Sequence, residues 1–312
     1  MPDMVPIFDR DLVRRRRERA AGAFDRYDFL FREVGERLVD RLDDVTRVFP
    51  LALDLSCRGG GLADLLGGRG GIRTLVHCDL SEAMVRGVKT AASGPERLAL
   101  VADEEWLPFA PGRFDLILSN LGLHWINDLP GVLVQARRAL KPDGLFLATL
   151  FGAGTLAELR SALADAEIAA EGGMSPRVSP FPDLRDAAHL LQRAGFALPV
   201  ADVDVITVRY ADAFGVMRDL RGMGETNAMV ERRRTFLRRS TLMAAAAGYH
   251  ERFGGADGRI PATFQVITLT AWAPHESQPQ PLRPGSATAS LSDALADDRA
   301  DDRADDRGEG TP

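Results

Sequence analysis

Apolar stretches of strand length alternate with stretches of helical spacing through the first half of the chain. The helical pattern is clearest at 129–140, which ends at the turn signal Lys141-Pro142-Asp143-Gly144. Strands that alternate with helices form parallel sheets through right-handed crossover connections. The first half therefore predicts an α/β domain, with strands at 51–55, 74–78, 98–102, 114–119 and 145–150.

The second half of the chain has fewer strands and more helical patterns. Helices predicted at 155–170 and 183–194 precede a strand at 203–210, and the last strand lies at 263–272. The interval between those two strands is too long for a hairpin loop. We interpret residues 211–259 as a helical insertion that covers the strand ends and serves as a lid over the substrate.

The two ends of the chain differ from this central domain, which we place at 49–274. Residues 1–48 are charged and amphipathic, and they predict an N-terminal helical segment. We interpret its basic run, Arg14–Arg17, as a solvated helix face rather than as a patch for an anionic partner. Residues 275–312 carry Asp-Asp-Arg-Ala repeats with Pro, Gly and Ser, a composition that cannot bury a core and predicts a disordered tail.

Composition argues against several classes of protein. The net charge of −6 comes largely from the tail, so the body lacks the basic signature of a nucleic-acid-binding protein. Cys57 and Cys78 have no metal-ligand spacing, and we expect no metal site. No stretch predicts a transmembrane span or a signal peptide, which leads us to expect a cytoplasmic protein. The oligomeric state stays open.

A glycine run follows the first predicted strand. Leu51–Leu55 is succeeded by Gly59–Gly61 and then by an apolar helical stretch. A strand, a tight glycine turn and a helix N-terminus together bring backbone N–H groups close to a nucleotide-like ligand. Asp54 on the strand suits a cationic ligand, and the sulfonium and amino groups of S-adenosylmethionine are cationic.

Further polar residues follow the next predicted strands, at the edge where parallel sheets bind ligands. Asp79 stands about 20 residues beyond the glycines, where an acid takes the ribose hydroxyls of a nucleoside; a helix-capping aspartate is the alternative. Asp103 would accept from an adenine amino group, with a solvated turn acid as the alternative. The candidate cofactor-binding residues are Asp54, Ser56, Arg58, Gly60, Asp79, Leu80, Asp103, Glu104 and Asn120.

Three residues are candidates for the chemistry itself. His124 follows the fourth predicted strand, where cofactor and substrate should meet, so it is a candidate general base or substrate contact. A structural histidine is the alternative. Trp125 would form a wall of the pocket. Glu225, with Asn227 nearby, lies in the glycine-rich turn of the insertion and is a candidate substrate contact, with ordinary turn chemistry as the alternative.

Several motifs between about residues 24 and 273 carry a resemblance to known families. The motifs are Phe49-Pro-Leu-Ala-Leu-Asp-Leu, Ala102-Asp-Glu-Glu-Trp-Leu-Pro-Phe, Leu123-His-Trp-Ile-Asn-Asp-Leu-Pro, Leu140-Lys-Pro-Asp-Gly, Glu171-Gly-Gly-Met-Ser-Pro with Ser179-Pro-Phe, and Gly222-Met-Gly-Glu-Thr-Asn. With these motifs the chain resembles the class I S-adenosylmethionine-dependent methyltransferases, a group that includes malonyl-acyl carrier protein O-methyltransferase. It is more similar to the family of the mitochondrial complex I assembly factor five, reported as an arginine hydroxylase of a complex I subunit.

The resemblance implies a Rossmann-like seven-stranded class I methyltransferase fold with N-terminal helices and a helical lid. It implies S-adenosyl-L-methionine as cofactor and a protein substrate, with a respiratory complex I subunit as partner and no nucleic acid. The choice between methyl transfer and hydroxylation stays open. The alternatives are an O-methyltransferase for an acyl-carrier-bound or small carboxylate, and an assembly chaperone without turnover.

The glycine turn departs from the family pattern, which reads Asp-Leu-Gly-Cys-Gly-x-Gly. Ser56 and Arg58 stand where two of the glycines are expected, and Gly60 keeps its place. A Cβ at position 58 lies near the expected ligand carboxylate, and the required backbone conformation disfavours a side chain. The Arg58 guanidinium would either pair with the methionine carboxylate or weaken the cofactor site, which is what the chaperone alternative requires.

Overall fold

The fold comes from a computed structural model that describes residues 5–89 and 94–279. The chain divides into a unit of residues 1–275 and a second of residues 276–312, and every helix and strand named below belongs to the first. Most of the predicted disordered tail, 275–312, lies outside the described residues. Among the described residues, no helix has the length and apolar character needed to cross a membrane.

Seven strands form one sheet in the order β3-β2-β1-β4-β5-β7-β6. The first five run parallel to one another, and β7 lies antiparallel between β5 and β6. This arrangement confirms the predicted Rossmann-like seven-stranded fold. The strands are β1 (Leu51–Leu55), β2 (Thr74–Asp79), β3 (Glu96–Val101), β4 (Phe114–Ser119), β5 (Leu140–Phe151), β6 (Ala197–Tyr210) and β7 (Ile260–Trp272).

The central strands are buried on both faces, which explains why they read as apolar runs. Leu53 and Ile117 pack with α5 (Leu129–Ala139) and α7 (Leu184–Arg193) on one face. Their neighbours Ala52 and Leu116 point the other way, toward α2 (Phe29–Asp40) and α3 (Gly61–Leu65). The period of two along each strand thus supplies both layers of the core.

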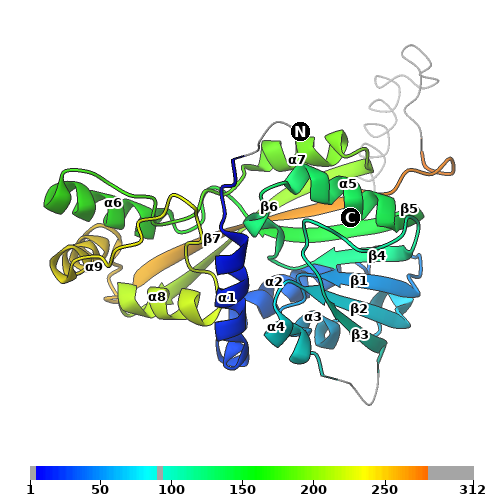
Figure 1. Cartoon of the computed structure of the whole chain (residues 1–312), viewed down its shortest axis with the longest axis horizontal. Helices are drawn as coiled ribbons and strands as arrows, with labels where there is room; N and C mark the ends of the chain where they lie inside the picture. Colours follow the sequence, from blue (N-terminus) through cyan, green and yellow to red (C-terminus); the bar gives the residue numbers. More distant parts are fainter. Residues whose placement is uncertain (1–4, 90–93, 280–312) are drawn as a thin grey trace, which may run out of the picture. The chain divides into compact units, whose positions relative to one another are not determined.

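The interval between β6 and β7 contains two helices, α8 (Ala213–Gly222) and α9 (Arg239–Phe253). The second begins later than the predicted 230–252, because residues 223–238 form turns and loops. Figure 1 shows α9 beside α6 (Ala157–Glu171), with which it shares a hydrophobic cluster built around the buried Tyr249.

The N-terminal helix α1 (Arg10–Ala21) is capped by Asp9, whose side chain accepts a hydrogen bond from the Leu12 N–H. In Figure 1, α1 stands between the parallel strands on one side and α6, α8 and α9 on the other. Its buried residues are Val13, Arg17 and Ala20. The solvated-face interpretation of the basic run is therefore wrong for Arg17, which is 0% exposed.

The other short elements lie close to the sheet or to the ends of its strands. They are α4 (Glu82–Arg86) and the 3₁₀ turns η1 (Phe24–Arg26), η2 (Arg69–Gly71) and η3 (Leu123–Trp125). Ser81 caps α4 by accepting a hydrogen bond from the Met84 N–H.

Candidate functional site

The turn after β1 has a run of left-handed backbone conformations. The φ angles are 63° at Ser56, 46° at Arg58, 86° at Gly59 and 82° at Gly60. Two of these positions carry side chains, at a cost on the order of 1 kcal/mol or more each. The left-handed backbone at positions 56 and 58 explains why the family pattern has glycine at both. The structure also shows Gly122 facing the turn, where an added Cβ would lie 2.3 Å from the Cβ of Ser56.

Asp54 lies on β1 directly beside His77 on β2. The Asp54 Oδ2 and His77 Nδ1 atoms are 2.9 Å apart, and both side chains are buried. The carboxylate predicted to face a cationic ligand is thus hydrogen-bonded within the sheet. The other ring nitrogen of His77, Nε2, has no hydrogen-bond partner among the described residues.

Asp79 and Glu104 share a buried partner, Arg17 of α1. The Arg17 Nη1 atom lies 3.2 Å from Asp79 Oδ1 and also donates to Glu104. All three side chains are 0% exposed. Burial alone would lower the pKa of Arg17, but the two carboxylates raise it above its ordinary value. Burial would likewise raise the pKa of Glu104, but Arg17 and Arg10 hold it well below its usual range.

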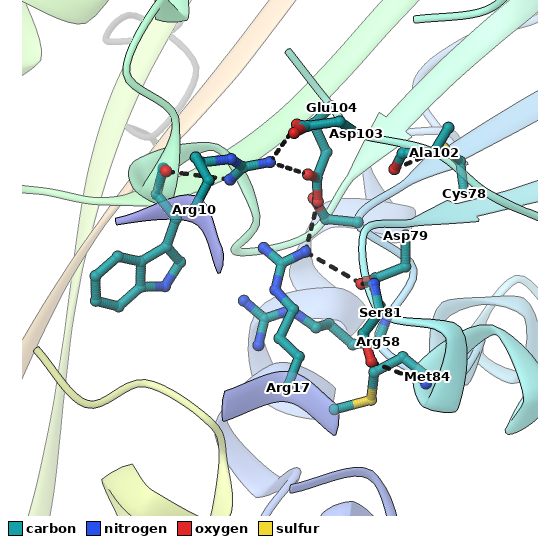
Figure 2. Close-up of polar contacts among 12 residues, drawn as sticks. Arg10, Arg17, Arg58, Cys78, Asp79, Ser81, Met84, Ala102, Asp103 and Glu104 are labelled. Carbon is teal, nitrogen blue, oxygen red and sulfur yellow. Dashed lines mark hydrogen bonds and ion pairs between the residues drawn. The ribbon is translucent and has the colours of Figure 1, made fainter. Parts of the chain in front are cut away.

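Arg10, the first residue of α1, lies at the same end of the sheet. Its guanidinium pairs with Asp103 at 2.6 Å and with Glu104, and it donates to the Trp125 carbonyl at 3.1 Å. Figure 2 shows Arg10 and Arg17 extending toward Asp79, Asp103 and Glu104. We call these five residues the arginine clasp. It joins α1 to the carboxylates that follow β2 and β3.

A second buried charge cluster joins the glycine turn to the insertion. The Arg58 guanidinium lies 2.7 Å from Glu225 Oε1 and over the ring of Phe31. The other carboxylate oxygen, Glu225 Oε2, accepts from Trp125 Nε1 at 2.7 Å and lies 2.8 Å from His124 Nε2. The structure therefore brings the three candidate catalytic residues into direct contact.

Electrostatics in this second cluster favour a charged carboxylate and a neutral imidazole. Burial would raise the pKa of Glu225, but Arg58 and His124 lower it to about 2. Burial lowers the pKa of His124 despite the attraction of Glu225. Burial and repulsion by Arg17 lower the pKa of Arg58. His124 Nδ1 has no hydrogen-bond partner among the described residues, so one ring nitrogen keeps its capacity for a proton or a hydrogen bond.

Asn120 and Leu80 are closely packed, whereas Arg58 also borders a cavity of about 230 Å³ beside Gly59 and Gly61. Asn120 donates to the Phe31 carbonyl at 2.8 Å and accepts from Thr149 at 3.0 Å. Leu80 is half-buried between Asp79 and the cap of α4. Asp54, Ser56, Arg58 and Asn120 help to line a cavity of about 30 Å³, room for one or two water molecules.

The arrangement does not fit S-adenosylmethionine with α1 docked. The ribose and adenine would need carboxylates that can accept their hydrogen bonds, but α1 supplies arginine partners to Asp79, Asp103 and Glu104. The strand ends, the glycine turn and the acids lie together, as a nucleoside-binding site requires. The acids, however, accept their hydrogen bonds from arginines of the same chain.

A larger cavity, of about 570 Å³, lies against the insertion. Glu225 and Asn227 line it, together with apolar side chains such as Phe181 and Leu159. Five arginines also contribute to its wall, namely Arg16, Arg177, Arg232, Arg233 and Arg234. The cavity is therefore apolar inside and rich in positive charge.

One of the family motifs shapes the wall of this cavity. Glu167 of α6 accepts from both the backbone N–H and the hydroxyl of Ser175, and it pairs with Arg177. Arg233 from the insertion pairs with Glu171, the first residue of the Glu-Gly-Gly-Met-Ser-Pro motif. These contacts hold the loop after α6 against the insertion and give the motif a structural role.

Sequence reasoning missed Arg10, Arg17 and His77 as members of the site. The helical spacing of Val13, Arg17 and Ala20 was a usable signal, because it places Arg17 on the apolar stripe of α1. No comparable signal marks Arg10. His77 lies within a predicted strand, and only the pairing of β1 with β2 shows that it contacts Asp54.

Comparisons with known proteins agree with this architecture. A family model described as "Methyltransferase domain" matches residues 53–148. A solved YcgJ protein from Bacillus subtilis has a TM-score of 0.52 with 15% identity, covering 76% of this chain and 98% of its own, which shows a shared fold. A Bacillus halodurans protein assigned to the methyltransferases gives a TM-score of 0.53 with 16% identity, over 76% of this chain and 99% of its own.

Similarity to curated proteins is much stronger. "Arginine-hydroxylase NDUFAF5, mitochondrial" from Danio rerio is 44% identical over 92% of this chain and 89% of the relative. The Homo sapiens protein of the same name is 44% identical over 94% and 84%. "Malonyl-[acyl-carrier protein] O-methyltransferase" from Xylella fastidiosa is 37% identical over 87% and 90%. The predicted cytoplasmic location is contradicted by this comparison, because the NDUFAF5 relatives are named as mitochondrial proteins.

Proposed function

The chain belongs to the family of the NDUFAF5 arginine hydroxylases and carries a methyltransferase domain, and on that premise we propose that it modifies an arginine of a protein substrate. The proposed partner is a subunit of respiratory complex I, and the proposed cofactor is S-adenosyl-L-methionine. The two proposals concern adjacent places: the cofactor at the strand ends, and the arginine at the junction of His124, Trp125 and Glu225.

One observation carries the arginine proposal. Glu225 already holds a guanidinium, that of Arg58, at 2.7 Å in a buried setting with an aromatic ring alongside. A carboxylate and a ring face are the two features that bind a planar guanidinium well. Glu225 also lines the 570 Å³ cavity, so a side chain entering from there would meet the same carboxylate. A substrate arginine would replace Arg58 at Glu225.

The chain's own residues have distinct tasks in this proposal. Glu225 would bind the substrate cation, and Trp125 would fix the carboxylate through its indole N–H. Burial lowers the pKa of His124 and so favours the neutral imidazole, whose unpartnered Nδ1 atom is able to accept a proton. The aromatic rings of Phe151 and Phe181 flank the imidazole and exclude water from it.

The experiment combines the purified chain with S-adenosylmethionine and an arginine-bearing peptide from the proposed partner. A matched peptide with lysine in place of the arginine is the control. We expect modification of the arginine peptide alone. A mass gain of one carbon and two hydrogens reports methyl transfer, with S-adenosylhomocysteine as the co-product. In a parallel reaction supplied with dioxygen and an electron donor, a gain of one oxygen reports hydroxylation. Binding of S-adenosylhomocysteine should raise the Tm through linkage, and Asp79→Ala should remove that shift.

A carboxylate substrate is the second candidate, because the cavity wall is positive. Burial and repulsion by the neighbouring Arg232 lower the pKa of Arg16 to about 10, and Arg16 donates a hydrogen bond to the Thr226 carbonyl. An anion bound in the cavity would offset the repulsion between these two arginines. The malonyl-acyl carrier protein O-methyltransferases are relatives whose name states such a substrate. Methylation of an acyl-carrier-bound carboxylate, with neither peptide modified, would favour this candidate and refute the arginine proposal.

A further inference from the structure

We propose that α1 is a gate of the nucleoside site: the arginine clasp holds the carboxylates that a nucleoside would use, and the ligand binds only when α1 withdraws together with the loop at 226–232. The inference rests on the proposed function, in that the ligand is S-adenosylmethionine or its demethylated product. Beyond that function, the inference adds one conformational step, the withdrawal of α1. This step would link the nucleoside site to the 570 Å³ cavity at the insertion.

The first argument is that two of the carboxylates are buried and already accept hydrogen bonds from within the chain. Asp79 accepts from Arg17, from the Ser81 backbone N–H at 2.9 Å and from the Arg58 backbone N–H at 3.3 Å. Glu104 accepts from Arg10, from Arg17 and from the Ser56 hydroxyl at 2.7 Å. Both acids are 0% exposed. A ribose therefore cannot reach these carboxylates until Arg17 leaves.

The second argument is that the docked helix is incompletely satisfied. Arg17 Nε and Nη2 are buried and have no hydrogen-bond partner among the described residues. A buried donor without an acceptor is destabilising, because it has lost its hydrogen bonds to water. The apolar residues that α1 buries beside Arg17 are small, Val13 and Ala20. The position of α1 over the acids is therefore destabilised by the unpartnered donors of Arg17. A helix that can withdraw needs such a weakly held position.

The third argument is the connection between α1 and the insertion. Residues just before α1 form an antiparallel bridge, Phe8 with Met229, supported by hydrogen bonds from Asp9 N to Ala228 O and from Val230 N to Ile7 O. Arg232 pairs with Asp9 at 3.1 Å. Withdrawal of α1 would pull on the loop that follows Glu225, so freeing the acids and opening the cavity become one motion.

The test compares Arg17→Gln with Arg14→Gln in the full chain. Both changes remove a positive charge from α1, but the Arg14 side chain is 40% exposed and pairs with Glu18 on the surface. Isothermal titration with S-adenosylhomocysteine measures affinity. If α1 is docked in about nine molecules of ten, the apparent affinity is reduced about tenfold. We expect Arg17→Gln to bind about tenfold more tightly than the natural chain, and Arg14→Gln to be unchanged.

Hydrogen exchange on the natural chain supplies a readout that does not depend on any variant folding. Saturating S-adenosylhomocysteine should increase exchange in residues 10–21 and 226–232 together. Unchanged affinity in Arg17→Gln, or binding to the natural chain with α1 still protected, would overturn the gate and leave the proposed cofactor intact. Absence of binding in every variant would overturn the proposed cofactor and the gate with it.

Discussion

Replacing Glu225 with glutamine removes the carboxylate that faces Arg58, His124 and Trp125. The pKa of Glu225 falls from the ordinary 4.5 to about 2, which corresponds to about 3 kcal/mol of stabilisation of the charged form. Loss of one partner from a buried ion pair costs about 3–5 kcal/mol by itself. We therefore expect Glu225→Gln to lower the free energy of unfolding by about 3 kcal/mol at pH 7, out of a typical total of about 5–15 kcal/mol.

The pH dependence has a definite sign. Because the folded pKa lies below the unfolded one, the contribution of Glu225 is complete above the ordinary, unfolded pKa of 4.5. It is lost as the pH falls toward the folded value of about 2. The natural chain and Glu225→Gln should therefore converge in stability as the pH falls through this interval, and differ fully at neutral pH.

Urea unfolding followed by tryptophan fluorescence measures both quantities. Glu18→Gln, which disturbs the surface pair with Arg14, is the control and should cost no more than about 1 kcal/mol. Adding Arg58→Met to Glu225→Gln should restore part of the loss, because it removes the buried charge left unpaired. A loss below about 1 kcal/mol at pH 7, or one that does not shrink in acid, would refute the reasoning.

Two further predictions concern packing and the tail. Gly122→Ala should destabilise the chain by about 1–3 kcal/mol, because the new Cβ would meet Ser56 in its left-handed turn; unchanged urea unfolding would contradict this. Deletion of residues 276–312 should leave the Tm and ligand binding unchanged, since the segment is mostly polar, charged and repetitive; a fall in Tm of more than about 4 °C would contradict the predicted disorder.

The strands and the location of the site could be predicted from the sequence because both depend on local patterns. Apolar runs of strand length gave β1, β2 and β4 within a residue, and the glycine run identified the turn after β1. The polar residues that follow parallel strands necessarily gather at one edge of the sheet. Boundaries were less accurate where the local pattern is ambiguous, as at β5, which begins at Leu140, before the predicted turn.

The lid was predictable only in outline. The interval between the last two strands indicated helices, and α8 and α9 are there. That Glu225 contacts His124 and Trp125 depends on how the insertion folds back over η3, a contact across about 100 residues of sequence. The assignment of these residues to substrate binding stays a prediction, as do the cofactor roles of the acids.

The sequence by itself determined which residues reach the carboxyl edge of the sheet, because strands that alternate with helices run parallel and end at the same edge. It could not determine what those residues bind there. Asp79 and Glu104 accept from Arg17, and Glu225 from His124 and Trp125, because tertiary structure places α1 and the insertion over the same edge. A buried carboxylate needs a partner of opposite charge or a hydrogen-bond donor close to it in space. Which residue that partner is depends on distances between side chains, and these are set only when the whole fold has formed.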